Sequence, residues 1–266
     1  MNIATDNILM GMLLTLLAGL STGIGSTIAF LYKRANTKFL SGALGLSAGV
    51  MIYISFMELM PEGQTLLEET YDGKTAELYT LIAFFLGIAI IALIDFLVPE
   101  DENPHEVHTK ADIDNMKKLK RTGIMTALAI SIHNFPEGMA TFATALNDID
   151  LAIPIMIAIA IHNIPEGMAV SVPIYHATGN RRRAFWLSFF SGMAEPIGAA
   201  IGFFFLLPFW SPSVNAILLS VVSGIMVYIS FDELLPATER FGHHHIGILG
   251  VIIGMLLMAG TLWIGA

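Results

Sequence analysis

The chain has 266 residues, of which 55% are hydrophobic and only 13% charged, and its formal net charge is −9. Its mean hydropathy of +0.71 is higher than a water-soluble domain shows, so the composition excludes an ordinary soluble protein. The sequence contains no cysteine. Disulfides, thiolate metal ligands and a cysteine nucleophile are therefore excluded as well.

Long apolar segments recur along the chain, and eight of them have about the 20 residues that a helix needs to cross the bilayer core. We predict transmembrane helices at residues 8–31, 39–60, 78–98, 123–146, 151–175, 184–207, 214–235 and 246–264. The first run lacks a basic segment before it and a clear cleavage site after it, so we expect a helix there and no signal peptide. Residues 1–266 should thus form one all-α transmembrane domain.

Basic residues are segregated between the loops. All but one of the 13 Lys and Arg residues follow the first, third, fifth or seventh predicted helix, and the exception is Lys74. Because basic loops stay on the cytoplasmic side of a membrane, both termini and the loop from Glu62 to Glu77 should face outward. The segregated residues are Lys33, Arg34, Lys38, Lys110, Lys117, Lys118, Lys120, Arg121, Arg181, Arg182, Arg183 and Arg240.

The longest polar segment, about residues 99–122, has the composition of a cytoplasmic linker. It contains His105 and His108, and three further histidines follow the seventh predicted helix at His243, His244 and His245. These histidines could capture or sense metal, but we favour solvated loops as their explanation.

Two internal repeats occur in the sequence. The phrase His-Asn-x-Pro-Glu-Gly begins at His133 in the fourth predicted helix and again at His162 in the fifth. Residues 49–61 (GVMIYISFMELMP) and 224–236 (GIMVYISFDELLP) share nine identities in 13 positions, in the second and seventh helices. The two helices of each pair run in opposite directions. Similar segments of opposite orientation indicate an inverted repeat with a 3+2+3 arrangement of helices, which is common in secondary transporters.

The repeated phrase places metal-ligand groups inside apolar helices. Residues three and four apart share a helix face, so His133 and Glu137 project together, with Asn134 beside them. The second copy supplies the equivalent groups His162, Asn163 and Glu166. Such groups are costly in hydrocarbon unless something neutralises or solvates them. If the two faces meet, the six groups surround one polar volume that suits a divalent cation.

Other residues extend this candidate site. Glu195 on the sixth predicted helix is the natural partner of the central pair, because three carboxylates can neutralise most of the charge of two bridged divalent ions. Pro136 and Pro165 each remove a backbone donor, which lets their helices expose a carbonyl oxygen. Met51 on the second helix could offer a thioether to a softer ion, although methionine is more often a core filler.

With these motifs, the chain resembles the ZIP (Zrt/Irt-like) family of divalent metal transporters, particularly its bacterial zinc-uptake branch. The resemblance rests on the phrases at 133–138 and 162–167, with support from residues 191–195 (SGMAE) and the basic third loop, and it covers all eight predicted helices. It implies a binuclear transport site and import of metal across the plasma (inner) membrane. The implied ligands are His133, Asn134, Glu137, His162, Asn163, Glu166 and Glu195, with Met51 as a further sulfur ligand.

The chemical types of the predicted ligands limit which metal ions the protein is expected to transport. Imidazole and carboxylate suit zinc above all, and iron(II), manganese, cobalt and cadmium are also compatible. Magnesium and calcium are disfavoured because histidine is a poor ligand for hard ions. We therefore expect a zinc carrier in the lipid bilayer, with divalent metal ions as its substrates, no cofactor and no nucleic-acid partner.

Three other interpretations stay open from the sequence. A metal-selective channel could use the same residues as a filter. An intramembrane metalloenzyme is disfavoured, because the sequence has no His-Glu-x-x-His phrase and no evident serine nucleophile arrangement. The Gly-x-x-x-Gly patterns at 198–202 and 250–254 are compatible with a homodimer or with packing inside one chain.

Overall fold

The computed structural model describes residues 5–30, 37–97, 116–147, 149–206, 209, 211–240 and 242–265, and its regular elements are all helices, which confirms the predicted all-α fold. These helices are α1 (Thr5–Ala29), α2 (Thr37–Ile54), α3 (Met60–Glu68), α4 (Gly73–Leu97), α5 (Met116–Asn147), α6 (Ile149–Thr178), α7 (Arg181–Gly192), α8 (Ala194–Leu206), α9 (Pro212–Ile229), α10 (Leu235–Arg240) and α11 (His244–Gly265). Two π-helical turns, Ser55–Leu59 and Ser230–Leu234, join α2 to α3 and α9 to α10.

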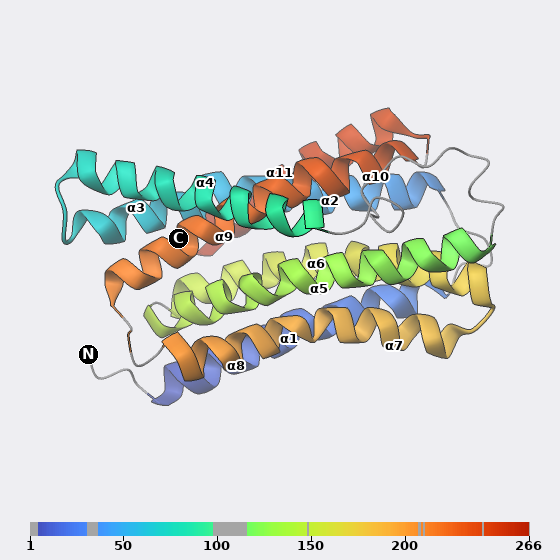
Figure 1. Ribbon diagram of the computed structural model, residues 1–266, viewed down its shortest axis with the longest axis horizontal. Helices are drawn as coiled ribbons and strands as arrows, with labels where there is room; N and C mark the ends of the chain where they lie inside the picture. Colours follow the sequence, from blue (N-terminus) through green and yellow to red (C-terminus); the bar gives the residue numbers. More distant parts are fainter. Residues whose placement is uncertain are drawn as a thin grey trace.

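The elements form eight long helical runs at the positions of the eight predicted segments (Figure 1). In the described part of the chain, seven runs are long and apolar enough to cross a membrane, and α5 is not among them. Lysines in its first turns and the polar phrase in its middle lower its hydropathy. Since α5 begins at Met116, the end of the predicted linker 99–122 is helical. The remainder of that linker, with His105 and His108, lies outside the described residues.

Three predicted helices are interrupted where we expected continuous ones. The sixth divides at Met193 into α7 and α8, three residues before Pro196, whose ring would clash with the carbonyl group of Gly192 in a regular helix. The second and seventh each contain a π-helical turn that ends two residues before a proline, Pro61 or Pro236. A proline supplies no N–H for the helical hydrogen-bond ladder, so the wider turn is accommodated next to it.

Short polar side chains cap the helices at the connections between them. The Asn180 side chain accepts a hydrogen bond of 3.0 Å from the backbone N–H of Arg183 at the start of α7. Before α4, the Asp72 carboxylate accepts bonds from the hydroxyl and the backbone N–H of Thr75, and these bonds hold the pKa of Asp72 below its ordinary value. Such caps satisfy backbone donors at the helix ends.

Successive helical runs alternate in direction along the bundle. In Figure 1 the turns joining α6 to α7 and α10 to α11 lie at the right-hand end, whereas α3 and α4 are joined at the left-hand end. Lys38 and Arg181–Arg183 begin helices at the right-hand end, and Lys74 begins α4 at the other. The segregation of basic residues along the sequence therefore becomes a segregation between the two ends of the bundle.

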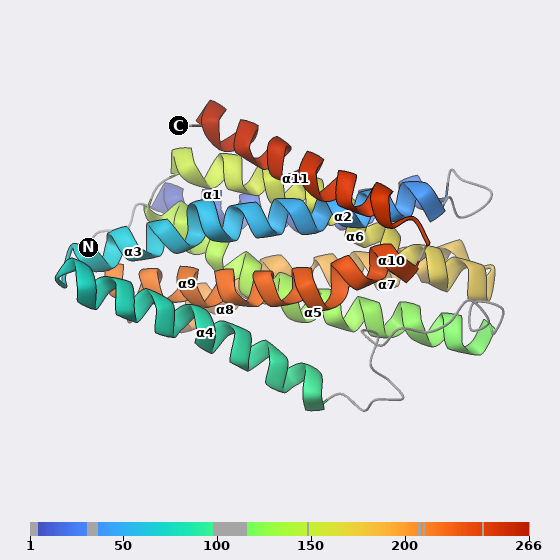
Figure 2. The ribbon, with the colours of Figure 1, turned by 90° about the horizontal axis from the view of Figure 1, so that it is seen from above.

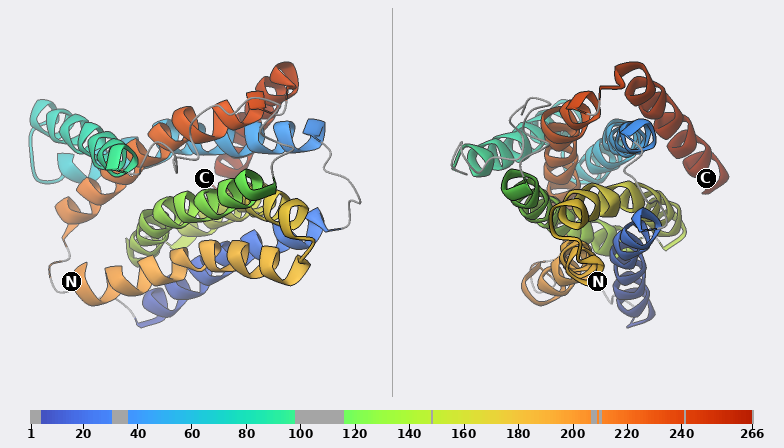
Figure 3. Two further views of the ribbon diagram at one scale, coloured as in Figure 1. Left: turned by 45° about the vertical axis from the view of Figure 1, so that its right-hand side comes forward. Right: turned by 90° about the vertical axis from the view of Figure 1, so that its right-hand side faces the viewer.

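The helices pack in two layers that follow the internal repeats. One layer contains α2, α4, α9 and α11, and the other contains α1, α5, α6, α7 and α8 (Figure 3, right). Within the first layer α2 packs on α11 and α4 packs on α9 (Figure 2); within the second, α1 packs on α6 and α5 packs on α8. Each contact has a counterpart in the other half of the chain, as an inverted repeat requires.

Glycines bring the paired helices into backbone contact. Gly49 on α2 faces the carbonyl group of Val251 on α11, and the equivalent Gly224 on α9 faces that of Phe84 on α4. Three glycines of the two Gly-x-x-x-Gly patterns, Gly198, Gly250 and Gly254, face the carbonyl groups of Phe135, Gly42 and Leu46 of the same chain. These glycines therefore serve packing within one chain, and the homodimer stays a prediction that they do not support.

The main apolar core lies between α2, α6 and α9. Outside it, α4 and α11 carry large exposed side chains such as Phe85, Phe96, Leu256 and Trp263. An outer surface of this kind suits contact with lipid rather than water. The outer faces of α4 and α11 are thus apolar, while large apolar side chains of α2 and α9 fill the core.

We expect Gly49→Ala to lower the stability of the protein, because the added methyl group meets the Val251 carbonyl oxygen in a packed interface. Overpacking of this kind costs about 1–3 kcal/mol. The matched control is Gly260→Ala on α11, where an added methyl group meets no atom within 4 Å. Thermal melting of both variants in detergent checks this, and equal melting temperatures would contradict it.

Candidate metal site

The two copies of the repeated phrase lie on α5 and α6, which pack along each other in the centre of the bundle. Pro136 and Pro165 both lie inside continuous helices. The structure buries all seven nitrogen- and oxygen-bearing side chains of the predicted ligand set to 2% exposure or less. These residues are His133, Asn134, Glu137, His162, Asn163, Glu166 and Glu195.

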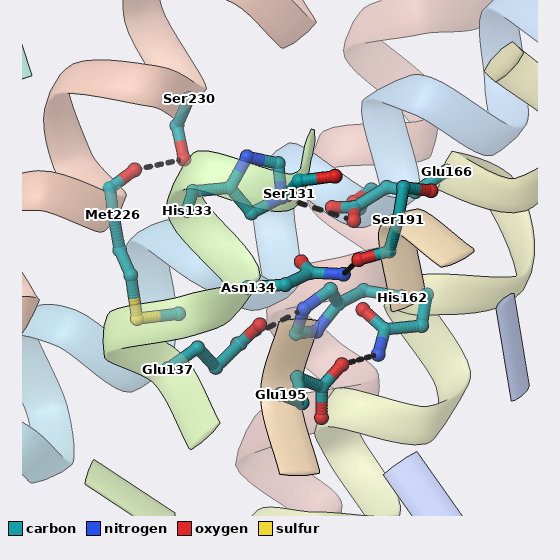
Figure 4. Close-up of polar contacts among 12 residues, drawn as sticks. Ser131, His133, Asn134, Glu137, His162, Glu166, Ser191, Glu195, Met226 and Ser230 are labelled. Atoms are coloured by element: carbon teal, nitrogen blue, oxygen red, sulfur yellow. Dashed lines mark hydrogen bonds and ion pairs between the residues drawn. The ribbon is translucent and has the colours of Figure 1, made fainter. Parts of the chain in front are cut away.

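The histidine of each helix meets the glutamate of the other. His133 Nε2 lies 3.1 Å from Glu166 Oε2, and His162 Nε2 lies 3.1 Å from Glu137 Oε1 (Figure 4). Two ligand atoms on a tetrahedral zinc ion are about 3.3 Å apart, given metal–ligand bonds near 2.0–2.1 Å. The 3.1 Å distance is that of a direct hydrogen bond or ion pair, and a small separation of each pair would reach the spacing of two ligands on one ion.

The two asparagines tie α5 and α6 to their neighbours in equivalent ways. Asn134 Nδ2 donates to the carbonyl oxygen of Ser191 on α7 at 3.3 Å, and Asn163 Nδ2 donates to that of Ala18 on α1 at 3.2 Å. Asn163 also donates to a carboxylate oxygen of Glu195. This second bond joins Glu195 to the groups of the central helices, as the sequence predicted.

Several polar atoms of these side chains are buried without a hydrogen-bond partner among the described residues. Besides the paired atoms His162 Nε2 and Glu137 Oε1, they are His133 Nδ1, Asn134 Oδ1, Glu137 Oε2, His162 Nδ1, Asn163 Oδ1 and Glu195 Oε2. A buried polar atom that forms no hydrogen bond costs about 1–3 kcal/mol. Most of these atoms are oxygens that can coordinate a cation, so the site has the donors that a metal ion would use.

The arrangement consists of pairs rather than a preformed cage. Across the described part of the chain, no three His, Asp or Glu side chains are grouped as ligands around one point. Instead, each imidazole lies 3.1 Å from a carboxylate oxygen of the other helix. A cation that binds here has to separate the His–Glu contacts by small rotations of side chains that already face one another.

Ser47 on α2 is a site residue that the sequence did not single out. Its hydroxyl donates to Glu166 Oε1 at 3.0 Å, while Glu166 Oε2 faces His133. Serines in apolar helices commonly donate to a carbonyl group of their own helix, as Ser55 does to Met51. A serine in such a sequence therefore does not by itself indicate a contact with another helix. No sequence pattern marked this contact between α2 and α6.

The remaining metal-binding candidates lie in other surroundings. Met51 is fully buried and belongs to the main apolar core, where its predicted role as a sulfur ligand stays untested. At the right-hand end of the bundle, His243 Nε2 lies 3.1 Å from the Thr37 hydroxyl, and His244 Nδ1 lies 3.1 Å from Glu239 Oε1. His244 and Glu239 are both more than half exposed, as expected for solvated polar groups.

Comparison with known proteins identifies the family. A family model described as ZIP zinc transporter matches residues 98–261. The chain is 58% identical over 267 residues to a zinc transporter ZupT of Akkermansia muciniphila, with 97% of this chain and 98% of that protein covered. It is 59% identical to a zinc transporter ZupT of Streptococcus mutans, with 94% and 95% covered, and 54% identical to one of Clostridium perfringens, with 97% and 96% covered.

The family model spans more than half of the chain, and the relatives match nearly all of it. The resemblance drawn from the repeated phrases is therefore confirmed. The chain belongs to the ZIP zinc transporter family and is a multi-pass membrane transporter, not an enzyme.

Proposed function

We propose that this protein is a carrier that imports zinc across the plasma (inner) membrane through the buried His/Asn/Glu site of α5 and α6. The cross-helix pairing of His133 with Glu166 and of His162 with Glu137 carries the proposal, because it concentrates zinc ligands where both helices are buried. The relatives that bear the name zinc transporter support the choice of ion. Nitrogen and oxygen donors together also accommodate iron(II), manganese, cobalt and cadmium.

The site has the charge to hold two ions. Glu137, Glu166 and Glu195 together supply three negative charges, which offset most of the charge of two divalent cations when carboxylates bridge them. Asn163 supports this arrangement because its bond to Glu195 brings the third carboxylate to the central pair. We therefore propose a binuclear site whose ligands are the seven buried side chains described above.

Burial of the site favours a carrier over an open channel. All seven side chains are at most 2% exposed, so an ion enters or leaves only when helices or side chains move. A channel filter, by contrast, keeps its ligands in contact with water while it conducts. The site of a carrier must bind the ion with moderate affinity, because an ion that is held too tightly is not released on the other side of the membrane.

We also propose that α5 is the eighth membrane span and that both termini face outward. α5 packs on α6 and α8, which belong to runs that are themselves apolar enough to cross the membrane, and α6 and α8 shield its polar phrase. With eight spans, the strongly basic end of the bundle is cytoplasmic, in agreement with the positive-inside rule.

The ligand assignment is tested by zinc uptake into liposomes containing the purified protein. We expect Glu137→Ala and Glu166→Ala to reduce uptake by at least about tenfold, since even the loss of an outer partner of a metal ligand costs about 10–100-fold. The control is Glu77→Ala, the same change at an exposed position of α4. Wild-type rates in both site variants would overturn the assignment, and absence of uptake by the wild type would overturn zinc transport itself.

The binuclear proposal is tested by anomalous scattering from crystals grown with zinc. We expect two ion positions between α5 and α6, about 3.5–4 Å apart, as in other carboxylate-bridged pairs. Glu195→Gln keeps the shape of the side chain but removes one charge, and should lose one of the two ions. A single ion in the wild-type protein, with Glu195 away from it, would show that the site is mononuclear.

The topology is tested by cysteine labelling, for which a chain with no cysteine is well suited. We expect Lys74→Cys to react with a membrane-impermeant maleimide in intact cells, because Lys74 is exposed at the end that we place outside. Arg182→Cys, exposed at the opposite end, should react only after the cells are permeabilised. The reverse labelling pattern would contradict the proposed orientation.

A further inference from the structure

Ser47 holds one of the two equivalent carboxylates of the site. Its side chain is fully buried, and its hydroxyl hydrogen can point only to one acceptor, which is Glu166 Oε1 at 3.0 Å. The other oxygen of this carboxylate, Oε2, faces His133 at 3.1 Å. Both oxygens of Glu166 are therefore fixed, one by α2 and the other by α5.

The equivalent carboxylate on α5 lacks this contact. The internal repeat relates Gly49 on α2 to Gly224 on α9. The same offset relates Leu46, which contacts Gly254, to Val221, which contacts Gly87, so packing establishes the register between α2 and α9. In that register Ser47 corresponds to Val222, which is buried but has no hydroxyl group. Correspondingly, Glu137 Oε2 has no hydrogen-bond partner among the described residues.

This asymmetry affects how each carboxylate can bind a cation. An oxygen that accepts one hydrogen bond keeps a second lone pair, so the Ser47 hydroxyl does not block Oε1 but holds it toward α2, while Oε2 faces His133 on α5. In this orientation Glu166 meets an ion between α5 and α6 through Oε2. Zinc in four-coordinate sites is satisfied by such ligands. Larger or harder ions take six or more ligands and readily accept both oxygens of one carboxylate.

We propose that Ser47 is a positioning residue that sets metal specificity, because its hydroxyl orients Glu166 for coordination through Oε2 and thereby favours zinc over ions with higher coordination numbers. This inference rests on the proposed role of Glu166 as a ligand. Specificity is a difference between two affinities. The hydroxyl therefore acts by holding Glu166 in an orientation that suits zinc better than ions that take both oxygens of one carboxylate.

The test compares zinc and manganese uptake by Ser47→Ala in liposomes. We expect the ratio of the zinc KM to the manganese KM to rise about tenfold, the effect of losing one hydrogen bond to a charged group. The matched control is Ser223→Ala on α9. Ser223 is equally buried, but its hydroxyl donates to Ser220 of its own helix, and the repeat places an alanine, Ala48, at the corresponding position of α2.

The outcomes separate this inference from the proposed function. Zinc uptake by the wild type, an altered KM ratio in Ser47→Ala and an unaltered ratio in Ser223→Ala would support it. An unaltered ratio in Ser47→Ala would overturn it, and so would equal loss of zinc and manganese uptake, which indicates a structural role. Ser47→Thr, which keeps the hydroxyl group, should restore the wild-type ratio if it melts at the wild-type temperature. If the wild type imports no zinc, the proposed function itself fails.

Discussion

The cross-pairing of imidazole and carboxylate groups between α5 and α6 is the interaction on which the rest of this structure depends. Ionisable side chains inside an apolar bundle are tolerated only when they are partnered. Each His–Glu pair meets that need across the helix interface, which places both repeated phrases face to face. The same pairing places the imidazole and carboxylate groups of the proposed site side by side in the centre of the bundle.

The surrounding helices make this interior possible by close backbone packing. Gly138 next to Glu137 faces the carbonyl group of Glu195, and Gly167 next to Glu166 faces that of Thr22. Together with the two asparagine bonds, these contacts attach α7 and α8 to α5, and α1 to α6, in equivalent ways. The polar residues of α5 and α6 are therefore enclosed on one side by α1, α7 and α8. The layer that contains α2 covers the other side.

The two halves of the chain are similar in outline and different in the groups that they bring to the centre. The π-helical turns recur in α2–α3 and in α9–α10, each next to a proline, so this distortion belongs to the repeat. Glu195 and Ser47, by contrast, have no equivalent in the other half. Since Thr22 occupies the place that corresponds to Glu195, and Val222 that of Ser47, the pseudo-symmetric scaffold carries an asymmetric set of donors.

The sequence alone determined the all-α class, the positions of the eight helical runs and most of the candidate site. Hydropathy and charge depend only on composition along the chain, and His133 and Glu137 share a face because of helical periodicity. Tertiary structure decided what depends on contact between distant segments: which histidine meets which glutamate, the division of α7 from α8, and the bond from Ser47 to Glu166. The residues next to a serine in an apolar helix do not identify its hydrogen-bond partner, so only the packing of α2 on α6 shows the contact of Ser47 with Glu166.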